Sequence, residues 1–67
     1  MATNTEIFKT ANLLIDTYGE MAPNGAKIKA DHLKDKGDTH GQKIWLRIAR
    51  AAESLLDEKR PDNAIVH

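Results

Sequence analysis

Cysteine is absent from this chain of 67 residues. Neither disulfide bonds nor thiolate-bound metal ions are therefore available to support the fold, which has to be stabilised by packing. No apolar run approaches the roughly 20 residues that a membrane span needs, and the first six residues lack the basic and apolar parts of a secretory signal. We expect no contact with membranes and, by default, a cytoplasmic location.

An excess of charge of either sign is also lacking, because ten lysines and arginines balance ten aspartates and glutamates. The chain as a whole therefore has no field that would attract nucleic acid or anionic lipid. The balance is uneven, since residues 21–50 contain seven basic residues and only three acidic ones. An anionic partner of this basic middle segment is therefore still a hypothesis to consider, although the whole chain is neutral.

The length allows one domain, residues 1–67, with one small core. A chain this short buries only about 60% of the surface that its unfolded form exposes, and one such core supplies roughly 3–5 kcal/mol of net stability. Contact with a partner or with a second copy would stabilise such a fold further.

Helical periodicity predicts an all-α fold, and the first helix is expected near residues 4–18. Thr3 and Glu6 match a capping box, in which each side chain accepts a hydrogen bond from the backbone of the other residue. Gly19 can adopt the left-handed conformation that ends a helix. Between them, apolar residues recur on one stripe about 120° wide, as in a helix with one buried face. The stripe consists of Ile7, Phe8, Ala11, Leu14, Ile15 and Tyr18.

A second helix is expected near residues 24–36, with a narrow stripe made almost entirely of alanine. Pro23 suits the first turn of a helix, whereas Asn24-Gly25 favours a turn, so we expect the helix to begin between Pro23 and Ala26. Small side chains let helices approach closely but bury little area, and this helix should therefore depend on its neighbours. The stripe consists of Ala22, Ala26, Ala30 and Leu33.

A third helix is expected near residues 39–59, after Gly37 has ended the second helix and Asp38 or Thr39 has capped the next. Arg60-Pro61 stops it, because proline disfavours helix at the preceding residue and cannot donate the next hydrogen bond. Its apolar stripe consists of Ile44, Trp45, Ile48, Ala51, Ala52, Leu55 and Leu56. The predicted fold is a compact three-helix domain, with residues 61–67 as a short flexible tail.

Residues 37–48 carry the pattern G-D-x-x-G-x-x-x-W-x-x-I, formed by Gly37, Asp38, Gly41, Trp45 and Ile48. The segment from about residue 8 to residue 56 resembles a family of short helical proteins of alphaproteobacteria that is known as a domain of unknown function. Its other matching positions are Tyr18-Gly19, Ala22-Pro23, Leu33 and Leu55. The resemblance implies an all-helical intracellular protein and carries over no catalytic or binding residue. Asn24-Gly25 departs from the helix-favouring residues that the resemblance leads us to expect.

No residue pattern predicts an enzyme. Ser54 lies within the third predicted helix, without a histidine at helical spacing to activate it. The loop 37–41 has two glycines before a helix, as anion-binding loops do, but Asp38 opposes an anion and no strand precedes the loop. The polar residues around this turn match no metal motif; they are His32, Asp35, Asp38 and His40. We predict no catalytic residue, no cofactor and no metal ion.

Lys43, Arg47 and Arg50 follow one another at i, i+4 and i+7 and form a basic stripe on the third helix. Two helices joined by a short glycine turn are also the outline of a helix-turn-helix, with the third helix as recognition helix. These three residues are the candidates for contact with DNA or RNA. Aspartates in residues 31–38 partly offset them, and charged stripes are usually solvated faces, so nucleic-acid binding is the alternative rather than the main expectation.

Leu13, Ile28 and Leu46 fall more than about 100° away from the apolar stripes of their helices. Single exposed apolar residues are common, but two or three together would form a patch for a partner helix or a second copy. The main expectation is a small protein-interaction or regulatory module, with a homodimer as one form. Leu13, Ile28 and Leu46 are its candidate contacts.

Overall fold

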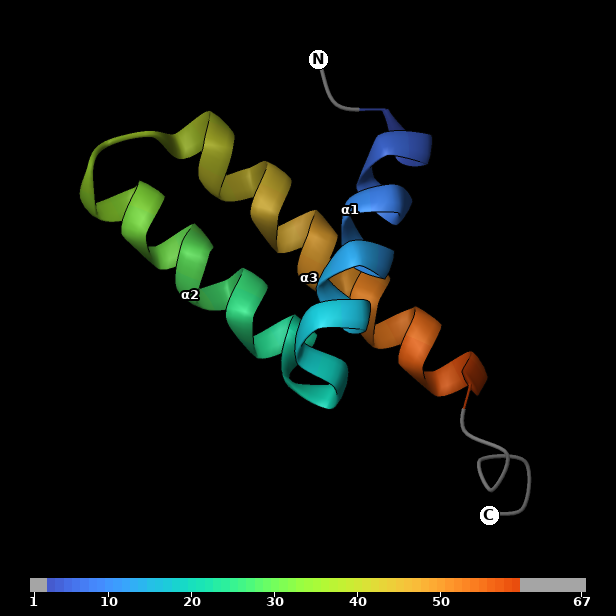
Figure 1. Cartoon of the computed structure of the whole chain (residues 1–67). Coiled ribbons are helices and arrows are strands. Elements are labelled where there is room, and N and C mark those ends of the chain that lie inside the picture. Colours follow the sequence, from blue (N-terminus) through green and yellow to red (C-terminus); the bar gives the residue numbers. More distant parts are fainter. Residues whose placement is uncertain (1–2, 60–67) are drawn as a thin grey trace, which may run out of the picture.

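Two helical stretches separated by one short turn make up the computed structural model, which describes residues 3–59 (Figure 1). The first stretch contains α1 (Asn4–Tyr18), the short 3₁₀ helix η1 (Gly19–Met21) and α2 (Ala22–Asp35), which follow one another without a break. The second stretch is α3 (Thr39–Lys59). The expected all-α class is confirmed, since residues 3–59 contain no strand. The tail predicted at residues 61–67 lies outside the described residues.

The ends of α1 agree with the predicted range and have the predicted caps. The Thr3 Oγ1 atom accepts a hydrogen bond from the Glu6 amide at 3.2 Å, and Glu6 Oε1 accepts one from the Thr3 amide at 3.4 Å. This reciprocal pair is the expected capping box. At the other end Gly19 has φ 61° and donates its N–H to the Ile15 carbonyl. Residues with a side chain rarely adopt this φ, so the end of α1 depends on glycine.

The second α-helix begins at Ala22, earlier than the predicted start at residue 24. The backbone already forms a helical turn in η1, and the Ala22 N–H donates to the Gly19 carbonyl. Pro23 lies in the first turn of α2, where it has no N–H that would need a partner. Ala22, Pro23 and Ala26 are buried. Their burial outweighs the poor helix propensity of Asn24-Gly25, so tertiary packing determines this boundary.

Backbone hydrogen bonds close the turn between α2 and α3. Gly37, with φ 83°, donates its N–H to the Lys34 carbonyl at 2.9 Å. The Asp38 N–H donates to the Leu33 carbonyl at 2.8 Å. The two bonds together form a Schellman motif. The motif ends α2 at Asp35, one residue before the predicted end at residue 36.

Asp38 caps α3, which agrees with the predicted range 39–59. Its Oδ1 atom accepts a hydrogen bond from the Gly41 amide at 2.9 Å, so Asp38 rather than Thr39 satisfies the first turn. A Cβ atom on Gly41 would lie 2.6 Å from Asp38 Oδ2 and 3.1 Å from Leu33 Cδ1. Because Leu33 comes from α2, the absence of a side chain at Gly41 lets α2 and α3 approach closely.

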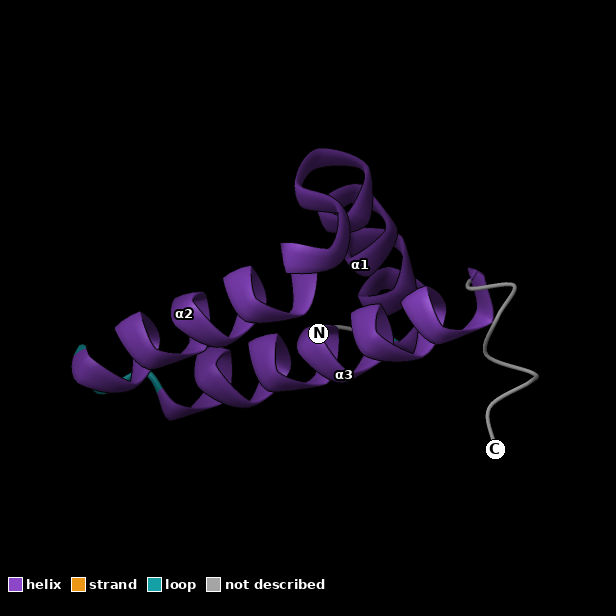
Figure 2. Ribbon diagram, turned by 90° about the horizontal axis from the view of Figure 1, so that it is seen from below, coloured by secondary structure: helices purple, strands orange, loops and turns teal. Residues whose placement is uncertain are grey.

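α2 and α3 lie side by side in opposite directions and form a helical hairpin (Figures 1 and 2). α1 crosses one face of this hairpin, on the half away from the α2–α3 turn (Figure 2). α1, with 15 residues, is also shorter than α3, with 21, at about 22 Å against about 32 Å. The half of the hairpin next to the turn therefore lies beyond α1 on that face.

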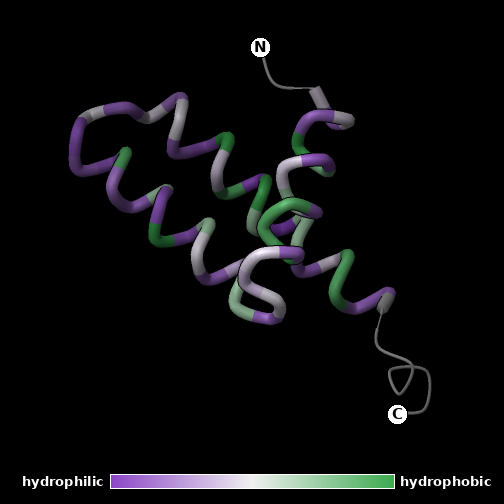
Figure 3. Tube along the Cα trace, viewed as in Figure 1, coloured by the Kyte–Doolittle hydropathy of each residue, from purple (hydrophilic) through white to green (hydrophobic). Residues whose placement is uncertain are grey.

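The core where the three helices meet is made mainly of small side chains. Its ten buried hydrophobic residues are Ile7, Ala11, Ile15, Ala22, Ala26, Ala30, Ile48, Ala49, Ala51 and Ala52. Five larger residues are only partly buried and pack against it; they are Leu14, Ile44, Trp45, Leu55 and Leu56. Figure 3 shows apolar positions recurring along each helix between hydrophilic ones. Seven of the ten buried residues are alanines, so the core contributes little apolar area for its number of residues.

Two predicted core positions of α1 are wrong. Phe8 and Tyr18 belong to the predicted apolar stripe, but 44% and 56% of their surface is exposed. Because α1 crosses the hairpin, its buried residues lie only between Ile7 and Ile15. The stripes predicted for α2 and α3 are confirmed in outline, with the alanines and Ile48 buried and the other bulky residues partly buried.

We predict opposite effects for alanine substitutions at two helical glycines. Gly41→Ala lowers the free energy of unfolding by about 1 kcal/mol, because the new methyl group collides with Asp38 and Leu33. Gly25→Ala raises it by about 0.5–1 kcal/mol, because a Cβ there meets nothing within 4 Å and alanine favours helix. Urea unfolding followed by circular dichroism measures both. Equal effects of the two substitutions would contradict the close contact at Gly41.

Candidate interaction surfaces

Within residues 3–59, the side chains weighed for catalysis or metal binding do not form a site. Ser54 is exposed on α3, and no described histidine lines the groove beside it. No three histidine, aspartate or glutamate residues of this part of the chain are placed to hold a metal ion. Asp38, one of the residues near the turn, is engaged in capping α3. That the protein is not an enzyme stays a prediction.

A polar groove of about 520 Å³ lies between η1, α2 and the C-terminal half of α3. It is lined by acidic residues that include Glu20, Glu53 and Asp57, together with Lys27. The Lys27 ammonium and the Glu53 carboxylate form an ion pair at 3.2 Å, and both side chains are about half exposed. Such a pair contributes at most about 1 kcal/mol to stability. One exposed ion pair and two further carboxylates do not specify a ligand.

The basic stripe predicted on α3 lies on the surface, with Lys43, Arg47 and Arg50 all exposed. Arg47 and Arg50 line two grooves, one toward α1 and one between α2 and α3. The second groove also contains Leu46 and the Glu53 carboxylate. A phosphate group bound there would be attracted by the arginines, while the Glu53 carboxylate, which would repel it, is paired with Lys27 of the same groove.

α2 and α3 do not have the relative orientation of a helix-turn-helix. In that motif the two helices meet at roughly 90–120°, whereas α2 and α3 are antiparallel neighbours (Figure 1). The basic stripe is therefore part of the surface of a helical hairpin. α2 and α3 are therefore not arranged as a helix-turn-helix. Nucleic-acid binding by the basic stripe stays a prediction.

The three apolar residues that lie off the predicted stripes are exposed, but they do not share one patch. Leu13 is 64% exposed, Ile28 52% and Leu46 41%. Each lines a different groove, and Leu46 lies beside the basic stripe. Leu13 and Ile28 line two grooves that both involve α1 and the N-terminal half of α3. The structure thus separates Leu46 from the other two candidates.

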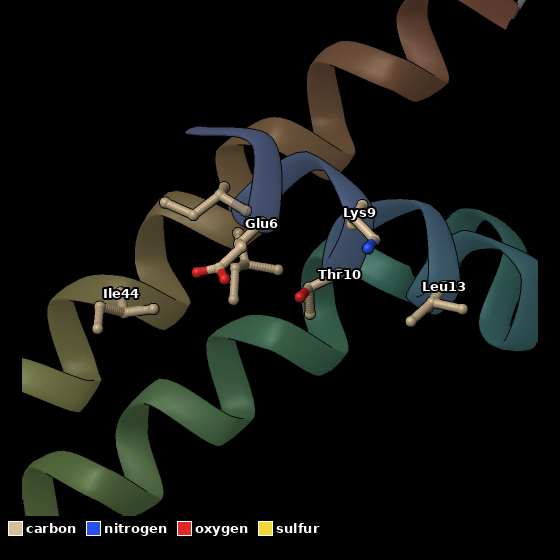
Figure 4. Close-up of a pocket in the computed structure, with 7 residues that line it drawn as sticks. Glu6, Lys9, Thr10, Leu13 and Ile44 are labelled. Carbon is tan, nitrogen blue, oxygen red and sulfur yellow. The ribbon is translucent and has the colours of Figure 1, made fainter. Parts of the chain in front are cut away.

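These two grooves lie on the side of α1 that faces the α2–α3 turn. One has a volume of about 370 Å³ and is lined by α1 and α3, with Leu13 of α1 at one end and Ile44 of α3 at the other (Figure 4). The other has a volume of about 260 Å³ and involves all three helices. The two grooves share no lining residue, but they are lined by consecutive residues on α1, Leu13 and Leu14, and again on α3, Ile44 and Trp45. We call the joint surface of Leu13, Leu14, Tyr18, Ile28, Ile44 and Trp45 the corner face.

Tyr18 and Trp45 are core residues by periodicity, yet both line the corner face. Tyr18 is exposed, and Trp45 is only partly buried. The helical period shows toward which side a residue points, but not how far the neighbouring helix extends over it. The sequence feature that indicates the exposure of Tyr18 is Gly19. It ends α1 directly after Tyr18 and so leaves that side chain at the border of the packed region.

We predict that the basic stripe contributes little to folding. Lys43→Ala, Arg47→Ala and Arg50→Ala each change the free energy of unfolding by less than about 0.5 kcal/mol, because these side chains are exposed. Trp45→Ala, the comparison on the same helix, lowers it by about 2 kcal/mol or more because Trp45 packs against the core. Chemical unfolding of the four variants measures the difference. A loss of more than about 1 kcal/mol at any stripe position would show a structural role instead.

None of the helices in the described part of the chain is both long enough and apolar enough to cross a bilayer. Comparisons with protein-family models, with curated proteins and with solved structures find no match for this chain. The resemblance carried by residues 37–48 and the cytoplasmic location therefore stay predictions.

Proposed function

We propose that this protein is a small helical interaction module with a regulatory role, which binds a protein chain and takes a homodimer as one of its forms. One observation supports the proposal above all. Apart from three buried isoleucines, the bulky apolar side chains lie at the edge of the core or outside it, while the other buried positions hold alanine or proline. Six of the bulky residues share the corner face.

The energetics of such a surface favour a partner. Full burial of one bulky apolar side chain is worth roughly 1.5–3 kcal/mol, which is large beside the few kcal/mol that a domain of this size holds in reserve. A partner that covers the corner face would therefore stabilise the fold through the same contacts that bind it. Apolar grooves between helices are also surfaces on which amphipathic helices dock. The arrangement fits a module that acts by binding rather than by catalysis.

Capture of a tagged chain from the cells that produce it tests the proposal. We expect a defined protein, either an untagged copy or another chain, to remain bound after nuclease treatment. The double substitution Leu13→Glu with Ile28→Glu should lower its recovery about tenfold, because it places charges in an apolar contact. Asn12→Glu, at an exposed polar position of α1, is the matched control and should leave recovery unchanged. Recovery of nucleic acid alone would contradict the proposal.

Nucleic-acid binding is the second candidate. It is favoured by the exposed stripe of Lys43, Arg47 and Arg50. Arg47 and Arg50 together line the same two grooves. Cationic side chains on a helix surface bind phosphates largely without regard to sequence, and such binding releases condensed counterions.

If the stripe binds DNA, the affinity for a short duplex falls steeply as salt is added. Three phosphate contacts predict a slope of about −3 in a plot of log affinity against log salt concentration. Replacement of all three stripe residues by alanine should abolish the binding, whereas Lys9→Ala, at an exposed position on α1, should change it little. Fluorescence anisotropy of a labelled duplex measures the affinity. Absence of binding at the lowest salt concentration would remove this candidate.

A further inference from the structure

We propose that the groove between α1 and α3 that contains Arg47 and Arg50 binds an acidic segment of a partner protein. Carboxylates of the partner bind the two arginines, and one apolar side chain beside them packs on Phe8. We call this groove the arginine groove; its walls include Ile7 and Phe8 of α1 and Arg47, Arg50 and Ala51 of α3. The inference rests on the proposed function as a protein-interaction module, but it concerns another surface than the corner face.

The charge of the arginine groove has one sign. Arg47 and Arg50 are three residues apart on α3, so their side chains are neighbours on the helix surface, and no carboxylate of residues 3–59 lines the groove. Neither guanidinium group forms an ion pair with this part of the chain, and the Glu53 carboxylate of the groove toward α2 is paired with Lys27. Adjacent arginines of this kind recognise acidic motifs, because a guanidinium group can donate two parallel hydrogen bonds to one carboxylate.

The arginine groove also contains an aromatic ring that the fold leaves exposed. Ile7 and Ala51 are buried core residues, whereas Phe8 is 44% exposed. Among the residues of α1 with bulky, exposed apolar side chains, only Phe8 lies outside the corner face. The volume of about 260 Å³ is below the roughly 300–1,000 Å³ of pockets for whole small-molecule ligands. It suits a side chain of a peptide, which gains free energy when it covers the ring.

The charge balance of the whole chain favours an acidic protein segment over nucleic acid in this groove. Nucleic acids gain affinity from many phosphate contacts and from long-range attraction, and a chain without net charge supplies little of the second. Two carboxylates of a peptide need only Arg47 and Arg50. Phosphate contacts also leave Phe8 without a role, whereas a peptide can place an apolar side chain next to its carboxylates.

Titration of the isotope-labelled full-length chain with short peptides, followed by amide NMR spectra, tests the inference. Each peptide contains two adjacent glutamates beside one leucine, phenylalanine or tryptophan in an otherwise neutral sequence. We expect the amide signals of Phe8, Arg47 and Arg50 to shift and those of the corner face to stay in place. Matched peptides with glutamine for glutamate, or with serine for the apolar residue, should bind at least about tenfold more weakly.

Variants of the chain separate the groove from the rest of the basic stripe. Arg47→Gln with Arg50→Gln should raise the dissociation constant of the tightest acidic peptide about tenfold or more, and Phe8→Ala should raise it about fivefold. Lys43→Gln removes a charge of the same stripe outside the arginine groove and should change the dissociation constant less than about twofold. Circular dichroism checks that the variants keep the helical content of the unchanged chain.

Three results would overturn the inference. One is the absence of shifts at the arginine groove with every peptide up to about 1 mM, and another is equal binding of the glutamate and glutamine peptides. The third is a single-stranded oligonucleotide that binds more tightly than every peptide and depends equally on Phe8, because a base stacked on the ring would then be the ligand. If the peptides fail while the protein recovered in the capture experiment still depends on Leu13 and Ile28, the proposed function stands and only the arginine groove is wrong.

Discussion

Ala22 and Ala26 of α2 belong to the same buried cluster as Ala49 and Ala52 of α3. Small side chains at these positions let the two helix backbones approach closely, and this approach makes the antiparallel hairpin possible. The same small size limits the apolar area that the contact removes from water. The rest of the fold depends on this combination of close approach and small buried area, because a hairpin with an alanine interface needs packing against a further element to be stable.

α1 supplies part of that cover. It contributes Ile7 and Ile15, two of the three isoleucines in the buried core, and packs them where it crosses the hairpin. A crossing helix covers only the region beneath it, so the bulky residues on either side stay at the surface. Tyr18 and Ile28 are exposed for this reason. The small area that α1 covers thus limits the stability of the fold, and it also leaves an apolar surface free for a partner.

The two candidate surfaces are physically separate. The corner face lies between α1 and the turn-side half of the hairpin and is mainly apolar. The basic stripe follows the exposed side of α3, with Leu46 beside it. An apolar contact depends on area and shape, whereas phosphate contacts depend on charge and weaken with salt. Because no residue of the stripe lines the corner face, each surface can be altered without the other.

Much of the local structure can be predicted from the sequence because it depends on groups within a few residues of each other. The capping box of Thr3 and Glu6, the ends at Gly19 and Gly37, and the cap at Asp38 arise from hydrogen bonds over three to five residues. Periodicity likewise identifies which side of each helix is apolar. The start of α2 was the exception, since burial of Ala22 and Pro23 overrides the local preference of Asn24-Gly25.

The candidate site was only partly predictable. Positions off the stripes correctly marked Leu13, Ile28 and Leu46 as exposed, but nothing in the sequence showed that Leu46 is separate from the other two. The helices, their caps and their apolar sides can be read from the amino-acid order alone, because they follow from short-range hydrogen bonds and a regular period. Which apolar residues stay exposed, and which of them lie on the same side of the molecule, depends on where α1 crosses the hairpin and how far it reaches, and these are properties of the packed structure.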